Sequence, residues 1–166
     1  EVVRGSKTDD TTVKRAVEFV QQIGKLPVIV KDSPGFVVNR ILVPYLVKAA
    51  EMLSGGDQIE AIDNAMVKFG MPMGPFRLMD EIGLDICYHV ADDLKNRLGI
   101  QYRLDELAWR ISRGELGKKA GEGFYKYKKG RSIKRKVKKN VDVAPLIKSM
   151  TDEAHKVLDE GVIDNS

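Results

Sequence analysis

The chain has 166 residues, of which 43% are hydrophobic and 31% charged, a composition typical of soluble globular proteins and sufficient for one domain with a core or one domain plus part of another. Its longest apolar runs are broken by Arg40, Pro44 and Lys48, and none approaches the roughly 20 residues of a membrane span, which excludes a membrane protein. The formal net charge is +4, but nine of the 28 basic residues lie in residues 126–139, leaving 19 against 24 acidic residues elsewhere. The basicity is therefore local.

The N-terminal sequence EVVRGSKTDD has neither an initiator methionine nor a signal-type pattern of basic residues before an apolar stretch. We interpret the chain as a piece of a longer protein. Cys87 is the single cysteine, so no internal disulfide can form, which favours a reducing compartment and a cytoplasmic location. Its neighbours Ile86 and Tyr88 favour a buried structural thiol over a reactive one.

Apolar residues at helical spacing predict a first helix, which Asp10 or Thr11 can cap and which Gly24 ends. The sequence LPVIV, residues 26–30, then predicts a short β-strand or an extended connector, because it is rich in β-branched residues.

A long apolar helix is predicted next. Ser33 is a good N-cap and Pro34 suits the first helical position, where its missing N–H costs nothing. The helix should run to about Leu53, with Pro44 kinking it where a backbone hydrogen bond is lost.

One amide lies within this apolar helix. Helical spacing places Asn39 on one face with Phe36, Val43, Leu46 and Ala50, where an unpaired amide would cost about 1–3 kcal/mol. Two interpretations remain open: a core asparagine bonded to a neighbouring loop, or an amide that faces a cleft and bonds a substrate or a catalytic side chain. Arg40, on the opposite side, predicts a structural or interface salt bridge.

The remaining chain predicts mainly helices. Asp57 and Glu60 resemble a capping box for a helix through Phe69, and further helices follow at residues 85–98, 104–112 and 143–160. Between the last two, GELGKKAGEGFYKYKKG has five glycines, and its aromatic run could pair as a short strand or lie over the core.

The chain carries no complete catalytic apparatus of its own. No GxGxxG follows a strand, and no P-loop is present. His89 and His155 lack partners at metal-ligand spacing, which favours structural or surface histidines over catalytic ones. The basic run 126–139 favours a solvated linker over a phosphate-binding patch, although a binding module for nucleic acid or an acidic partner stays open.

The last helix echoes the long apolar helix at an offset of 105 residues. This is a weak sign of a repeat, because amphipathic helices share much of the pattern by chance. The matched pairs are Ile41/Leu146, Leu42/Ile147, Tyr45/Met150, Ala49/Ala154, Met52/Val157, Leu53/Leu158 and Gly56/Gly161.

Three successive segments within residues 25–127 resemble the C-terminal helical domain of 3-hydroxyacyl-CoA dehydrogenase: KLPVIVKDSPGFVVNRILVPYLVKAAEMLSGG, IEAIDNAMVKFGMPMGPFRLMDEIGLD and GKKAGEGFYKY. The combination of DSPGFVVNR with PMGPFRLMD is highly specific. The resemblance implies an all-α, 6-phosphogluconate-dehydrogenase-like fold with at most short β segments. It also implies that the chain is part of an NAD-dependent enzyme of fatty-acid β-oxidation that oxidises L-3-hydroxyacyl-CoA to 3-oxoacyl-CoA, and that this part closes the substrate cleft.

The resemblance also assigns site residues. The family asparagine of PGFxVNR maps onto Asn39, and the family glutamate of LVEVIxG maps onto Glu1 in EVVRG. In the family a Rossmann domain binds NAD and supplies the catalytic histidine and a serine. All of these are expected upstream, so we expect the chain alone to be inactive.

The same resemblance divides the chain. It predicts the helical domain in residues 1–130, a basic linker in 131–142, and the truncated start of a second helical repeat in 143–166, as in multifunctional members of the family. Expected partners are a 3-hydroxyacyl-CoA substrate and a second copy of the chain, with no membrane and no nucleic acid. The rival hypotheses are a nucleic-acid-binding module built on the basic segment 126–139 and a non-catalytic dimerisation domain from a dehydrogenase of another 3-hydroxy acid.

Overall fold

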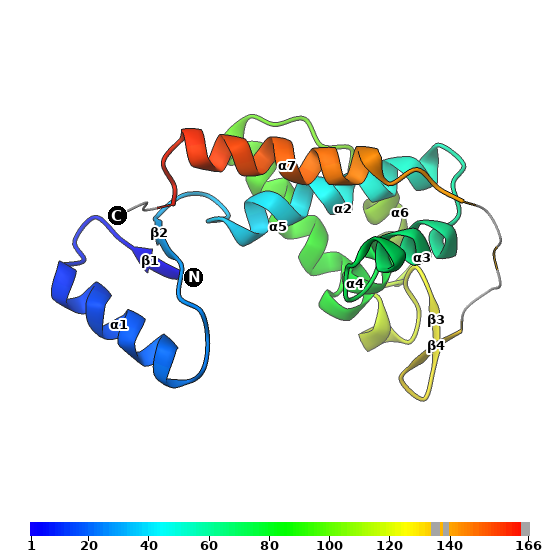
Figure 1. The fold of residues 1–166 in the computed structure, drawn as a ribbon. Helices are drawn as coiled ribbons and strands as arrows, with labels where there is room; N and C mark the ends of the chain where they lie inside the picture. The colour runs from blue at the N-terminus through cyan, green and yellow to red at the C-terminus, as the bar shows by residue number, and fades with distance from the viewer. Residues whose placement is uncertain (134–136, 138–139, 164–166) are drawn as a thin grey trace.

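The structure is a computed structural model that describes residues 1–133, 137 and 140–163. A small N-terminal lobe of two strands and one helix lies beside a larger helical body, and the N-terminus lies at the two strands, where Ile163 near the other end of the described chain also reaches Val30 (Figure 1). The elements are β1 (Val2–Arg4), α1 (Asp10–Gln22), β2 (Ile29–Lys31), α2 (Val38–Ser54), α3 (Ile59–Phe69), α4 (Pro75–Ile82), α5 (Leu84–Leu98), α6 (Asp105–Ser112), a 3-10 turn (Lys118–Ala120), β3 (Lys126–Lys128), β4 (Arg131–Ile133) and α7 (Ala144–Asp159).

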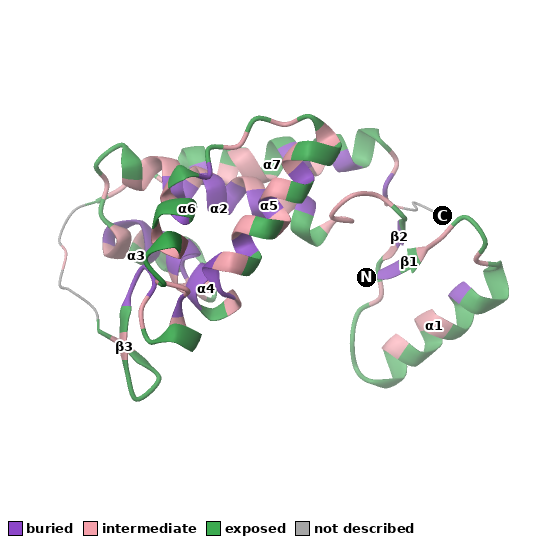
Figure 2. Cartoon of the chain, turned by 180° about the vertical axis from the view of Figure 1, so that it is seen from behind, coloured by how far each residue is buried: buried purple, intermediate pink, exposed green. Residues whose placement is uncertain are grey.

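The N-terminal lobe is a β-α-β unit. Strands β1 and β2 pair in parallel, with Val2 opposite Ile29, which confirms a strand at residues 29 and 30 of the predicted segment 26–30, whereas residues 26–28 lie before it. Asp9 caps α1 by accepting a 2.7 Å hydrogen bond from the Thr12 N–H, so the predicted cap at Asp10 or Thr11 is wrong by one or two residues. Most of α1 is exposed (Figure 2).

The long helix α2 begins four residues later than predicted. Gly35 and Phe36 both have positive φ angles, +73° and +50°, which α-helical residues do not adopt. Residues 34–37 form a turn instead, in which the Phe36 N–H donates to the Ser33 carbonyl (2.9 Å). The helix ends at Ser54, as the Ser-Gly-Gly sequence predicts.

Helices α2 to α6 enclose the main core. Their apolar faces converge on buried side chains, and the Phe76 and Phe124 rings pack in a tilted arrangement, with an interplanar angle of 58° and centroids 4.6 Å apart. The buried core residues are Tyr45, Leu46, Ala49, Ala50, Ile62, Met66, Phe76, Met79, Leu84, Cys87, Leu107, Phe124, Tyr125 and Leu146. No helix in the described part of the chain is long and apolar enough to cross a membrane.

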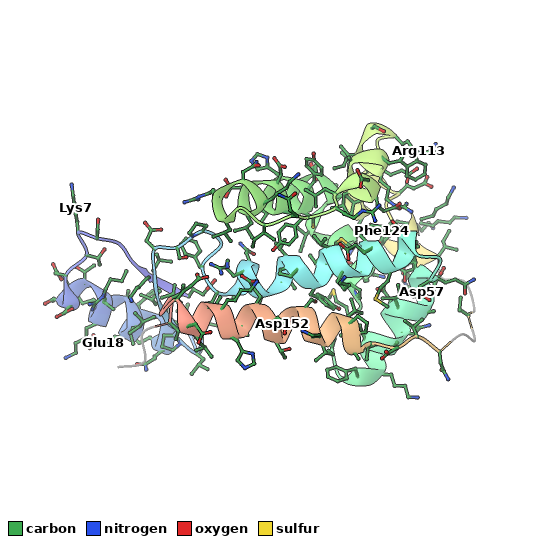
Figure 3. All side chains as sticks on the ribbon, turned by 90° about the horizontal axis from the view of Figure 1, so that it is seen from above. Lys7, Glu18, Asp57, Arg113, Phe124 and Asp152 are labelled. Carbon is green, nitrogen blue, oxygen red and sulfur yellow. The ribbon has the colours of Figure 1, made fainter. Side chains whose placement is uncertain are left out.

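Helix α7 lies along α2 (Figures 1 and 3). The two helices run antiparallel, as shown by Arg40 at the start of α2, which bonds Glu153 in the third turn of α7 and Glu160 directly after its last residue. Leu146 and Val157 are the buried apolar side chains of α7.

A short hairpin precedes α7. Strands β3 and β4 pair antiparallel, so the aromatic run ends in a strand, and the first three residues of the predicted basic linker, 131–133, form its partner. Within the basic segment 126–139, residues 134–136, 138 and 139 lie outside the described residues, as do residues 164–166 of the predicted second repeat.

Candidate functional site

The Glu1 carboxylate lies at the N-terminus of α2. Its Oε1 accepts hydrogen bonds from the Val37 N–H (2.7 Å) and the Val38 N–H (3.1 Å). These amides belong to the N-cap residue and the first residue of α2, where they have no intrahelical acceptor, and the helix dipole favours a negative charge there. The turn at Gly35 and Phe36 delays the helix start and so presents both amides to the carboxylate.

Asn39 follows immediately in the first turn of α2. Its side chain is exposed, so the interpretation of Asn39 as a core residue is wrong. It lines a cavity of about 200 Å³ between α2, α4, α5 and α6. Apart from the Cys87 thiol, the rest of the lining is apolar: Leu42, Val43, Leu46, Val47, Met79, Ile82, Ile86, Val90, Ala91 and Leu107. The structure therefore brings Glu1 and Asn39 to one helix end, with an apolar cavity next to them.

Cys87 contributes to the inner wall of this cavity and is 8% exposed. Burial raises the pKa of its thiol to about 12, so the thiol stays protonated near neutral pH. The prediction of a buried structural cysteine is confirmed.

Arg40 turns away from Asn39 into a buried ion network. Its guanidinium, 2% exposed, donates from Nε to Glu153 Oε1 (2.7 Å) and forms two bonds to Glu160, of 2.9 and 3.1 Å. Lys156 Nζ lies 3.1 Å from the other oxygen of Glu153. Hydrogen bonding to Arg40 lowers the pKa of Glu160, so this carboxylate stays ionised beside the delocalised cation. The predicted structural salt bridge is confirmed.

Two buried carboxylates support the scaffold, and sequence reasoning missed both. Asp63 of α3 accepts from the N–H groups of Phe76 and Arg77, at 2.9 and 3.0 Å, and from the Tyr125 hydroxyl, at 2.8 Å. It therefore caps α4 from a neighbouring helix. The cap residue itself is Gly74, at which a Cβ would lie 2.4 Å from the Asp63 Cα.

Asp80 of α4 holds the glycine-rich loop. It is fully buried and accepts from the N–H groups of Phe124 (2.8 Å) and Tyr125 (2.9 Å) and from the Tyr127 hydroxyl (2.8 Å). The loop passes so close that a Cβ at Gly123 would lie 2.1 Å from Asp80 Oδ1. The glycines of this segment thus allow the backbone to wrap a carboxylate.

Burial perturbs both groups. Desolvation raises the pKa of Asp63 to about 6, although its three hydrogen bonds oppose the shift, and it raises the pKa of Asp80 as well. A sequence signal for both residues existed, because each is a carboxylate on the apolar face of an amphipathic helix, the same argument that singles out Asn39.

The two histidines take no part in these arrangements. His89 and His155 are both exposed on their helices, in agreement with the surface interpretation. Within residues 1–133, 137 and 140–163, no group of three or more histidine, cysteine or acidic side chains could hold a metal ion.

Two family models match the chain. The model described as "3-hydroxyacyl-CoA dehydrogenase, C-terminal domain" matches residues 35–127, more than half of the chain. The model described as "3-hydroxyacyl-CoA dehydrogenase, NAD binding domain" matches residues 1–33. Asn39 lies in the first region and Glu1 in the second, so the candidate site joins pieces of two domains.

Similar proteins carry related names. The chain is 36% identical to the fatty acid oxidation complex subunit alpha of Vibrio parahaemolyticus over 98% of its own length and 25% of that protein. The chain thus spans about a quarter of this relative. Two crystal structures have similar folds: FadB2 of M. tuberculosis (39% identity, TM-score 0.72) and (S)-3-hydroxybutyryl-CoA dehydrogenase PaaH1 of Ralstonia eutropha (38% identity, TM-score 0.71). Each covers 76% of this chain, which covers 46% of either. The predicted all-α helical domain with short β segments is confirmed.

Proposed function

Since this chain belongs to the 3-hydroxyacyl-CoA dehydrogenase family, we propose that it is the cleft-closing part of an NAD-dependent enzyme that oxidises L-3-hydroxyacyl-CoA to 3-oxoacyl-CoA in fatty-acid β-oxidation. The names of its relatives, a fatty acid oxidation subunit and a (S)-3-hydroxybutyryl-CoA dehydrogenase, support this substrate class. We place the enzyme in the cytoplasm, in keeping with the one unpaired cysteine of this chain.

One observation carries the proposal. Asn39 is an exposed amide at the rim of an apolar cavity, and the Glu1 carboxylate is held at the preceding turn by two backbone N–H groups. A 3-hydroxyacyl group needs this combination, because its oxygens require hydrogen bonds while its acyl chain favours an apolar surface.

The roles follow from the chemistry of each group. Oxidation at C3 requires a base that takes the hydroxyl proton, and the family supplies it as a histidine of the NAD-binding domain. Glu1 would orient that imidazole and stabilise its cationic form, as a carboxylate does in a catalytic triad. Asn39 would hydrogen-bond the substrate oxygen or the imidazole and fix its position.

NAD, when bound, accepts the hydride that leaves C3. The β-α-β unit of residues 1–33 fits a piece of an NAD-binding domain, but its loop after β1, GSKTD, has no GxGxxG pattern. We therefore assign the cofactor mainly to the part of the NAD-binding domain that this chain does not contain, and no cofactor contact to residues 1–33.

The test is Asn39→Ala in the complete protein. We expect kcat to fall about 10²-fold, the usual effect of removing one preorganised hydrogen-bonding group, while thermal stability stays unchanged because the side chain is exposed. Asn96→Ala, an exposed asparagine on α5, is the matched control. Wild-type kinetics for Asn39→Ala would refute its role.

A second variant tests Glu1. Glu1→Gln keeps an oxygen that can accept from the amides of Val37 and Val38 but removes the charge. We expect kcat to fall. We also expect the dependence of kcat on pH to change, because the catalytic histidine would lose the charge that stabilises its protonated form. The 166-residue chain alone should show no oxidation of a 3-hydroxyacyl-CoA, and measurable turnover by it would contradict this assignment.

We also propose that residues 143–166 begin a second helical repeat after a linker at 131–142, and that the helical part of residues 1–130, from α2 onward, mediates self-association. The offset of 105 residues between apolar positions of α2 and α7, and their antiparallel packing, support the repeat. Sedimentation analysis of the complete protein tests the association, and a monomer at micromolar concentration would argue against it.

A further inference from the structure

The segment after the basic linker lies outside both family matches, yet it contacts both matched regions. Its helix α7 packs along α2, in the region matched by the helical domain. Its tail continues to β2, in the region matched by the NAD-binding domain: Ile163 forms an antiparallel bridge with Val30, and the Lys31 N–H donates to the Val162 carbonyl (2.8 Å).

A sharp turn makes the second contact possible. Gly161 adopts φ +60°, its N–H donates to the Leu158 carbonyl, and the Val162 N–H donates to the Val157 carbonyl (3.0 Å). This is a Schellman ending, which terminates α7 and redirects the chain. The tail therefore leaves the helix in the direction of β2.

Apolar side chains close the junction between the regions. Val30 of β2, Val157 of α7 and Val162 of the tail are 0%, 0% and 3% exposed and form one cluster. Phe36 and Val37, from the turn that offers its amides to Glu1, pack against this cluster. The junction thus lies next to the candidate site.

The ion network of Arg40, Glu153 and Glu160 also holds α7 against the start of α2. Arg40, next to Asn39 in sequence, bonds Glu153 in the third turn of α7 and Glu160 at its end. The Arg40 stem also supports the turn, since a Cβ at Gly35 would lie 3.4 Å from Arg40 Cγ. A guanidinium that bonds two carboxylates has little rotational freedom, so α2 and α7 are held in one register.

From these contacts we propose that residues 144–163 are an interdomain strap that fixes the NAD-binding-domain segment against the helical domain, with Arg40, Glu153 and Glu160 as positioning residues for Glu1 and Asn39. The positioning role rests on the proposed function, whereas the strap itself does not. A displacement of about 1 Å between groups on two domains can cost 10²-fold in rate, so a device of this kind has a measurable effect on catalysis.

Two variants separate positioning from folding. Glu153→Gln with Glu160→Gln keeps the shape of both side chains but removes their charges. Arg40→Met with Glu153→Leu replaces the buried ion pair by apolar groups of similar volume, a change that is often neutral for stability. Asp152→Asn is the matched control, because it removes an exposed ion pair with Lys148 on the same helix.

The first measurement is hydrogen exchange by mass spectrometry on the complete protein. A peptide spanning residues 28–38 contains the amides of Lys31, Val37 and Val38. We expect its exchange to accelerate at least about tenfold in both double variants and to stay unchanged in Asp152→Asn. Exchange within twofold of wild type in both double variants overturns the strap.

The second measurement is steady-state kinetics of the same proteins with a 3-hydroxyacyl-CoA and NAD. We expect kcat to fall about tenfold with an unchanged KM for NAD, because the strap would act by positioning Glu1 and Asn39, to which we assign no contact with the cofactor. An unchanged kcat with accelerated exchange overturns the positioning role. If the wild-type protein shows no dehydrogenase activity, the proposed function fails, and the exchange result still decides whether the strap exists.

Discussion

Replacing Asp80 by alanine should destabilise the fold far more than a typical loss of one carboxylate. The side chain is 0% exposed and satisfies two buried backbone donors, the N–H groups of Phe124 and Tyr125. An alanine leaves both unpaired in the core. The third donor, the Tyr127 hydroxyl, is half-buried and can reach water, so we assign it no cost.

The magnitude follows from these contacts. Each buried unpaired donor costs about 1–3 kcal/mol, which gives roughly 2–6 kcal/mol for two. Two effects offset part of this cost, by about 1 kcal/mol or more. The variant no longer buries a carboxylate, and alanine has a higher helix propensity than aspartate. A net loss of roughly 3 kcal/mol is a large share of the 5–15 kcal/mol that typically stabilises a domain.

Urea unfolding measures this loss. With a typical slope of about 2 kcal/mol per molar, the midpoint of Asp80→Ala should fall by roughly 1.5 M. The control is Asp93→Ala, an exposed residue of α5 whose ion pair with Arg97 spans 3.6 Å and should contribute about 0–1 kcal/mol. If Asp80→Ala shifts the midpoint no further than Asp93→Ala, the idea that Asp80 holds the glycine-rich loop is wrong.

Three further predictions concern the scaffold. Because burial raises the folded-state pKa of Asp63 from 3.8 to about 6, the folded state binds a proton more tightly than the unfolded state, and the contribution of Asp63 to the free energy of unfolding should fall as pH rises from 3.8 to 6. Asp63→Asn should remove this slope from urea midpoints measured across that range, and an unchanged slope would contradict the shift. Gly74→Ala should fail to fold or lose several kcal/mol in thermal melts, since its Cβ would meet the Asp63 backbone at 2.4 Å, whereas a normal melt would show that α3 and α4 can separate. Cys87 should resist iodoacetamide at pH 8 in the native protein and react in urea, and rapid native labelling would show that its thiol is accessible.

The sequence predicts every helix of the described residues except α4, because the apolar faces repeat at helical spacing and glycines mark most ends, whereas residues 75–82 are interpreted as part of a turn. It fails at the start of α2, where Ser33 and Pro34 have the chemistry of a helix start but Gly35 and Phe36 adopt positive φ angles. That turn depends on packing against Leu94 and Arg40, which no local rule contains.

The sequence also predicts only part of the candidate site and its surroundings. Motif resemblance identifies Glu1 and Asn39, and the structure places them at one helix end, but their catalytic roles remain predictions. The partners of Arg40 lie 113 and 120 residues further along the chain. The position of Arg40 on its helix could therefore predict that it pairs with a carboxylate, but not which carboxylate. Asp63 and Asp80 could have been found by applying the rule for Asn39 to every polar residue on an apolar helix face.

The exposed apolar side chains of the N-terminal lobe have a practical consequence for handling the 166-residue chain. Phe19 is 61% exposed, Ile23 55% and Leu26 87%, and within the described residues the outer edge of β1 pairs with no other strand. Exposed apolar side chains beside an unpaired strand edge promote aggregation. Oligomers formed by this chain in isolation would therefore reflect non-native association through the N-terminal lobe. The native assembly is better measured on the complete protein.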